Sequence, residues 1–128
     1  MTQTSFINVD LELFSKEDLS SISEELAGKI YPLTSEFIEG EYNLAFECSL
    51  NDEDPSKVIN EFIQLLNSLS DESKALLATC SKRTFDIGYD SGDEGFVTHT
   101  LTQNLLSNVL ALGFDIKITL YPLDNSEN

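Results

Sequence analysis

The chain has 128 residues, of which 23 are acidic and only seven are basic, so its formal net charge is −16. A charge of this sign repels nucleic acids and anionic membranes, because binding to them relies on basic residues that displace counterions. The same charge attracts basic proteins and speeds their encounter with the chain. There is no run of about 18 apolar residues of the kind that crosses a membrane. The composition thus excludes nucleic-acid binding and favours a basic protein as partner.

The composition is that of a single folded domain. Hydrophobic residues make up 41% of the chain, and we expect one domain over residues 1–128, with its core over residues 5–123 and a frayed C-terminal tail. The N-terminal sequence MTQTSFINVDLEL has neither the basic start nor the apolar run of a signal peptide, so we expect a cytoplasmic protein. In that compartment Cys48 and Cys80 are expected to be buried, reduced thiols.

The first third of the chain predicts a strand, a helix and a connection. Residues 5–14, SFINVDLELF, alternate between apolar and polar side chains, which predicts a strand with one buried face. A capping box that begins at Ser15 predicts a helix that runs to about Lys29. Residues 30–43 contain a proline and a glycine and are expected to form a connection.

The central third predicts one strand and two helices. Residues 43–50 alternate again and form the second predicted strand. Asp54 is a natural N-cap, and Pro55 is a natural first residue for the helix that follows. A second helical start at Ser70 leads to a helix that is expected to end near Lys82.

The last third predicts a strand, a helix and a strand. The strands cover residues 83–90 and 114–122, and the helix covers residues 98–112, with Gly113 just after its end. The even-numbered apolar residues of the last strand are expected to face the core. The element order is β-α-β-α-α-β-α-β. Because each strand alternates, we expect an α+β fold: a four-stranded antiparallel or mixed sheet with helices on one face and ferredoxin-like character.

The alternation also gathers acidic side chains on one face. If the even-numbered positions of the first strand face solvent, several acids share the uncovered sheet face and are relieved only by Lys117. These acids are Asp10, Glu12, Glu47, Asp86 and Asp115. Like charges that oppose each other on neighbouring strands destabilise a sheet, so we expect the field of these acids to have a use. The alternative is an outer face that is only solvated.

The loop DSGDEG, residues 90–95, raises the question of a metal or catalytic site. Aligning Gly95 with the invariant glycine of an EF-hand puts a glycine and a leucine where calcium ligands belong, which argues against calcium. Acids flanked by glycine are exposed, so they serve poorly as general acids, and they would repel a phosphate. We therefore expect no catalytic, cofactor or metal residues here, and we interpret Asp90, Asp93 and Glu94 as a flexible acidic turn of a partner-binding surface.

Two interpretations concern single residues. Tyr42, between Glu41 and Asn43, is the best candidate for an exposed aromatic residue that anchors a partner. An enzyme is the less favoured class, since it would need a pocket in which Asp86 and Asp90 form a carboxylate pair with perturbed pKa values.

Five segments carry a likeness to known proteins: SKEDLSSISEEL, IEGEYNLAF, DPSKVINEFIQLLNSLSDESKALL, TFDIGYDSGDEGF and LTQNLLSNVLALGFDIKITLYP. In this order they resemble a family of small bacterial α/β proteins without an assigned catalytic function. Members commonly end with a helix, an LG pair and a strand that carries LYP, as Leu112 and Gly113 do here. The likeness covers nearly the whole chain, and Tyr42 stands where Trp would be expected.

Small, acidic, cofactor-free proteins of this kind resemble the immunity proteins of bacterial toxin–immunity systems, including contact-dependent growth inhibition. The resemblance implies a cytoplasmic antidote, not an enzyme, that binds and occludes a basic toxin, in many cases a nuclease, through an acidic surface. The alternative is a small cytoplasmic regulatory or adaptor domain that uses a sheet edge or a helix groove. We expect no nucleic acid, membrane or cofactor as partner, and the sequence leaves the oligomeric state open.

Overall fold

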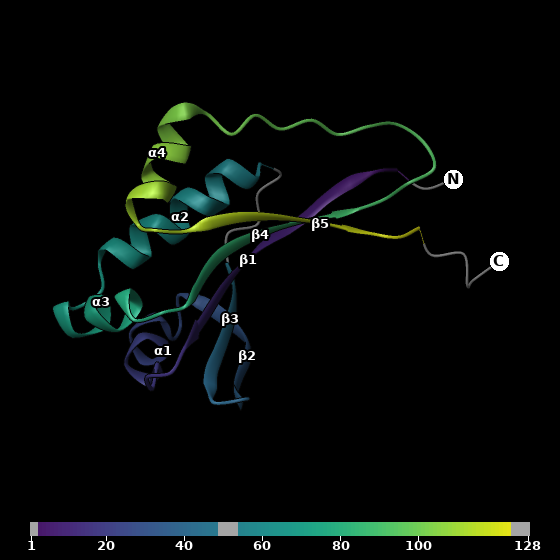
Figure 1. The fold of residues 1–128 in the computed structure, drawn as a ribbon. Helices are drawn as coiled ribbons and strands as arrows, with labels where there is room; N and C mark the ends of the chain where they lie inside the picture. Colours follow the sequence, from purple (N-terminus) through teal and green to yellow (C-terminus); the bar gives the residue numbers. More distant parts are fainter. Residues whose placement is uncertain (1–2, 49–53, 124–128) are drawn as a thin grey trace.

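The part of the chain that the structure describes forms a five-stranded sheet and four helices (Figure 1). The computed structural model describes residues 3–48 and 54–123. The strands are β1 (Ser5–Ser15), β2 (Ile30–Ile38), β3 (Glu41–Cys48), β4 (Lys82–Asp90) and β5 (Asp115–Tyr121). The helices are α1 (Ser20–Leu26), α2 (Pro55–Asn67), α3 (Asp71–Ala78) and α4 (Gln103–Ala111).

The strand order in the sheet is β2-β3-β1-β4-β5. β1 pairs antiparallel with both β3 and β4, β2 pairs antiparallel with β3, and β5 lies parallel to β4. β1 is therefore the central strand, and β2 and β5 are the edges. The predicted α+β class is confirmed. The predicted four-stranded sheet is wrong, and the ferredoxin-like arrangement is not confirmed.

The strand that the prediction missed, β2, lies in the segment interpreted as a connection. Pro32 belongs to an edge strand and lies beside a register shift, where a missing backbone N–H is tolerated. Glu39 and Gly40 have positive φ angles of 53° and 85°. They therefore form a tight two-residue turn between the paired residues Ile38 and Glu41. The proline and the glycine mark a hairpin and not a loop.

The core lies between the helices and the one face of the sheet that they cover (Figure 1). Val9, Leu11 and Leu13 of β1 are fully buried at this face, as the alternation predicts. Ile59 and Phe62 of α2 are fully buried on the helical side. Burial of a side chain of this size contributes about 1.5–3 kcal/mol relative to its exposure to water. Val9, Leu11 and Leu13 therefore fix which face of the sheet the helices cover.

Local signals set the beginnings of α2 and α3 as predicted. The Asp54 carboxylate accepts a hydrogen bond from the backbone N–H of Ser56 at 2.9 Å, and α2 follows it. The Ser70 hydroxyl accepts a hydrogen bond from the backbone N–H of Ser73 at 3.2 Å, and α3 follows it. Each cap satisfies a backbone donor that the first turn of a helix leaves without a partner.

Two helices begin later than predicted. The capping box at Ser15 is wrong, because β1 continues through Ser15, whose hydroxyl lies 2.7 Å from that of Thr79. Asp18 instead accepts a hydrogen bond from the backbone N–H of Ser20, where α1 begins. The last helix, α4, begins only after Thr102, whose hydroxyl accepts a hydrogen bond from the third residue beyond it.

Two predicted helix ends have different outcomes. Gly113 follows α4 with a φ angle of +75°, a conformation that favours glycine, so this end is confirmed. α3 ends at Ala78 and not near Lys82, which begins β4.

The last strand, β5, is less covered than predicted. Phe114 is only 5% exposed, and Ile116 packs against the core. Ile118 and Leu120, however, are 62% and 65% exposed. The helices lie over the beginning of β5, and its far end extends beyond them (Figure 1). Alternation correctly places these side chains on the helical face, but it does not supply a helix to cover them.

Some predictions fall on parts of the chain that are not described. The end of the second predicted strand at residues 49–50 and the C-terminal tail at residues 124–128 lie outside the described residues, as does the side chain of Cys48. Cys80 is a free, buried thiol, and burial raises its pKa to about 11.

Candidate functional site

The open face, defined here as the side of the sheet opposite the helices, carries three carboxylates in one line. The pairing register places Asp10 of β1 opposite Glu47 of β3 on one side and opposite Asp86 of β4 on the other. Lys117 of β5 comes next, opposite Asp86. We call Glu47, Asp10 and Asp86 the carboxylate row. The structure thus brings together side chains that are 37 and 39 positions apart in the sequence.

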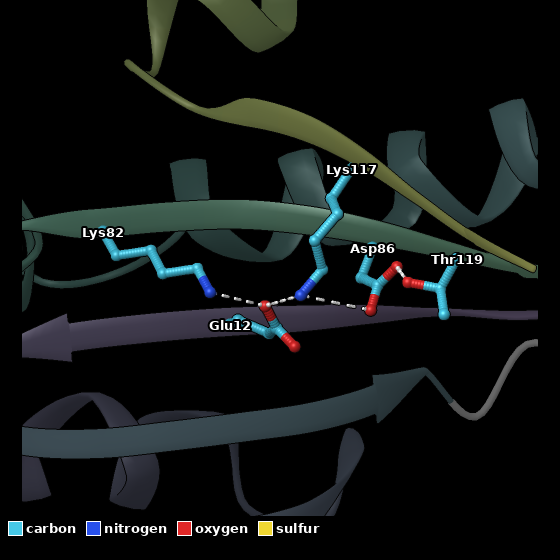
Figure 2. Close-up of polar contacts among 5 residues, drawn as sticks. All are labelled: Glu12, Lys82, Asp86, Lys117 and Thr119. Atoms are coloured by element: carbon cyan, nitrogen blue, oxygen red, sulfur yellow. Dashed lines mark hydrogen bonds and ion pairs between the residues drawn. The ribbon is translucent and has the colours of Figure 1, made fainter.

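Glu12 lies on the same face, two residues along β1 from Asp10, and two lysines neutralise it (Figure 2). The Nζ atoms of Lys117 and Lys82 lie 3.0 Å and 3.2 Å from the same Glu12 oxygen. Burial would raise the pKa of Glu12, but the hydrogen bonds from Lys117 and Lys82 outweigh it and hold the pKa below its ordinary value. The sequence predicted Lys117 as the only cation on this face. The structure adds Lys82, which binds the same carboxylate.

Asp86 is nearly buried and has partners for both carboxylate oxygens (Figure 2). The Thr119 hydroxyl donates a hydrogen bond to Oδ1 at 2.7 Å, and Lys117 Nζ lies 3.5 Å from Oδ2. Only 8% of Asp86 is exposed. A buried carboxylate is tolerated when it is paired and hydrogen-bonded in this way.

Asp10 has no such support. Its Oδ1 atom is buried and has no hydrogen-bond partner among the described residues. Burial, followed by the negative charges of Glu47, Asp86 and Glu12, raises the pKa of Asp10 to about 6, and Lys117 opposes this only in part. The ionised form of Asp10 is therefore poorly stabilised in the folded protein.

This arrangement can accept a positive group from outside. A cation beside Asp10 and Glu47 would meet carboxylates that Lys82 and Lys117 do not bind directly. Metal coordination is a different requirement, and within residues 3–48 and 54–123 no three His, Cys, Asp or Glu side chains are arranged to hold a metal ion. The geometry is that of an acidic surface on which, among the described residues, two carboxylates have no cation bound to them directly.

The acids of the loop after β4 lie away from the carboxylate row. Asp90 is exposed at the end of β4, about 13 Å along the strand from Asp86 at the usual rise per residue. Glu94 accepts a hydrogen bond from Gln3 Nε2 at 2.9 Å, and Asp93 is exposed in the same turn. The turn predicted to be flexible is thus held against the N-terminal residues and forms a second, separate acidic patch. The candidate pair Asp86 and Asp90 does not come together.

Tyr42 lies on the other side of the sheet and is not part of the open face. It occupies the helical face of β3, opposite the buried residue Ser15, and it is half-buried. Its ring packs against Phe37 with centroids 4.7 Å apart, and both rings line a pocket of about 460 Å³ beside α1. Of these two rings, Phe37 is the one that solvent reaches, since it is 62% exposed. Tyr42 is therefore not the exposed aromatic residue that the sequence predicted, and the five positions between Tyr42 and Glu47 in β3 put their side chains on opposite faces of the sheet.

Because the sequence analysis did not predict β2, it also did not predict the part of the open face that β2 forms. A pocket of about 270 Å³ lies on this face between β1, β3 and β2, and its lining includes Glu12, Glu36 and Ile38. Ile38 is 49% exposed. The β-branched and aromatic residues within residues 30–38 were the signal that could have placed these side chains, but the proline and the nearby glycine favoured a loop.

Comparisons with protein-family models, with curated proteins and with solved structures found no match to this chain. None of the helices in the described residues is both long and apolar enough to cross a bilayer.

Proposed function

We propose that this protein is an immunity-type inhibitor that binds a basic toxin through the open face of its sheet. The observation that carries the proposal is the Asp10 carboxylate, which is held between Glu47 and Asp86 with one oxygen buried and without a partner among the described residues. Like charges opposed on neighbouring strands destabilise the free protein. A partner lysine or arginine beside Asp10 would relieve this repulsion. Binding would therefore supply the compensating positive charge that Asp10 lacks in the free protein.

The remaining charge of the molecule supports a basic partner. The two lysines of the open face are already bound to Glu12 and Asp86, so they leave Asp10 and Glu47 to an incoming cation. The formal net charge of −16 adds attraction at long range. A nuclease toxin is the best match by class, since its active site is built to bind a polyanion. Inhibition would then be stoichiometric occlusion, without turnover.

The open face is also large enough for this task. Five strands at the usual spacing span about 20–25 Å, and the 11 residues of β1 extend over about 36 Å. The other strands have seven to nine residues, so the face covers about 600–700 Å², which approaches the roughly 800 Å² that each partner buries in a standard protein–protein interface. One toxin domain could therefore be covered by this face alone.

The test begins with a search for a toxin-like reading frame that ends just upstream of the gene for this chain, and it uses the domain which that frame encodes; the absence of such a frame counts against the proposal. Stopped-flow association is measured at about 50 mM and about 500 mM salt, together with inhibition of the toxin's nuclease activity. We expect nanomolar or tighter binding and an on-rate that falls with salt. Glu47→Lys should lower the on-rate about tenfold and the affinity further, because it reverses a charge next to Asp10.

Glu24→Lys is the matched control. Glu24 is exposed near the end of α1, and the substitution changes the net charge by the same amount on the helical side. It should leave inhibition intact. The proposal is wrong if the two variants inhibit equally well, or if association with the toxin domain is undetectable or indifferent to salt.

A further inference from the structure

One continuous stretch of the chain carries almost none of its charge. Residues 95–114 contain no Asp, Glu, Lys or Arg, and residues 115–123 contain only Asp115 and Lys117. Residues 95–123 therefore have a net charge of zero, and the rest of the chain carries the whole charge of −16. We call the surface formed by residues 95–123 the neutral side. It comprises the segment before α4, α4 itself and β5.

The neutral side also exposes large apolar side chains. On α4, Leu106 and Leu110 lie one turn apart and are 42% and 76% exposed. On β5, Ile118 and Leu120 are 62% and 65% exposed. Phe96, in the segment before α4, is 87% exposed. Exposed apolar groups that concentrate in one region of a protein usually mark an interaction site.

The two edges of the sheet differ in how they are protected. β2 carries Pro32, a register shift and the exposed Glu36, all of which hinder the addition of another strand. β5 contains no proline, and its register with β4 is unbroken. Among the described residues no strand lies beside the outer edge of β5. The backbone of β5 is therefore available to a further strand.

We propose that the neutral side binds a second copy of this chain, with the β5 edges of the two copies side by side. Two molecules that each carry a net charge of −16 repel each other over most of their surfaces. Contact through the neutral side lets them approach without opposing their acids. A basic partner would gain no electrostatic attraction from this side, so a second copy is the better match.

The two charged residues of β5 do not stand in the way of such a pairing. Asp115 and Lys117 lie two residues apart on the same face of the strand and have opposite signs. In an antiparallel pair with a twofold axis near Ile116, each Asp115 lies opposite the strand position of Lys117, whose own Nζ stays on Glu12 and Asp86, so the two Asp115 residues do not oppose each other. The open faces of both copies stay uncovered in this arrangement, so each remains able to bind its own partner.

The test is the mass of the full chain by sedimentation velocity over a range of concentrations. We expect a species of twice the chain mass of 14.3 kDa, and its dissociation constant should fall as salt rises, because salt screens the repulsion between the copies. Ile118→Glu and Leu110→Glu should each weaken the dimer at least tenfold, because each puts a charge into the apolar contact. Circular dichroism checks that both variants fold.

Phe37→Glu is the matched control, because Phe37 is as exposed as Ile118, at 62%, but lies on the far edge strand. It should leave the dimer unchanged. A chain that stays monomeric up to about 1 mM, where association is worth only about 4 kcal/mol, would overturn the proposal. A dimer that persists in both Ile118→Glu and Leu110→Glu, or that Phe37→Glu disrupts equally, would also overturn it.

Discussion

The open face and the neutral side meet along β5, yet their side chains are left unsatisfied in opposite ways. On the open face, acids are partly buried and crowded, and Asp10 keeps an oxygen without a hydrogen-bond partner among the described residues. On the neutral side, Ile118 and Leu120 reach solvent although their strand positions face the helices. Electrostatic repulsion destabilises the open face, whereas the neutral side exposes apolar area to water. Salt and pH should therefore act on the two regions differently.

β5 shows how one strand can serve both regions. Lys117 and Thr119 extend to the open face and hold Asp86 in place (Figure 2). Ile118 and Leu120 alternate with them and extend to the other face. Substitutions of the β1 and β5 residues that face the open face therefore test that region, and substitutions of Ile118 or Leu120 test the neutral side.

The largest effect on stability is expected from Lys117→Met. Lys117 lies within 3.0 Å of Glu12 and 3.5 Å of Asp86, so its loss leaves two partly buried carboxylates with less compensation. Because Lys117 itself is partly exposed, we expect the free energy of unfolding to fall by about 2 kcal/mol, less than for a fully buried pair. Urea unfolding at pH 7 measures the change. Lys74→Met, at an exposed position on α3, is the control and should change stability by less than about 0.5 kcal/mol.

A smaller effect of opposite sign is expected from Asp10→Asn. The pKa of Asp10 is about 6 in the folded protein against an ordinary value of 3.8, so the folded state resists ionisation of this group. The protonated form of Asp10 therefore favours the folded state. This contribution to the free energy of unfolding is present below about pH 4 and is lost as the pH rises through 6. Since Asp10 is partly solvated, we expect Asp10→Asn to raise the unfolding free energy at pH 7 by about 1 kcal/mol. Thermal unfolding at several pH values should show this gain shrinking toward pH 4, and equal stability at pH 7 would contradict it.

Glu25 on the helical side provides the contrast. Hydrogen bonds from Ser73 and then from Ser70 lower the pKa of Glu25 to about 2 from an ordinary value of 4.5. Its contribution is therefore present above about pH 4.5 and is lost as the pH falls toward 2, the reverse of Asp10. In the same melting series, Glu25→Gln should lower the melting temperature at pH 7 and lose its effect in acid.

The smallest effect on the folded monomer is expected on the neutral side. Leu110 is 76% exposed, so Leu110→Gln removes little buried area. At protein concentrations too low for association, the free energy of unfolding should change by no more than about 0.5 kcal/mol. A loss above about 1 kcal/mol would mean that Leu110 packs against its own chain, and the neutral side would then be part of the fold's support and not a free surface.

Features that depend on a few neighbouring residues were predictable from the sequence. The alternation of β1 correctly assigned Val9, Leu11 and Leu13 to the core, because side chains of a strand point to opposite faces in turn. The caps at Asp54 and Ser70 were correct, because a capping hydrogen bond joins residues two or three positions apart. The same local reasoning misplaced β2, where edge position and turn geometry made a proline and a glycine compatible with a strand.

The sequence by itself determined that this chain is acidic, that its strands have one apolar face and that several acids occupy the other face. Only the tertiary structure decided that Asp10 lies between Glu47 and Asp86, that Lys82 joins Lys117 at Glu12, and that the end of β5 is uncovered. The physical reason is the distance along the chain over which each interaction acts. Periodicity and capping act within a few residues, whereas strand order and helix placement follow from the best burial of the whole apolar surface.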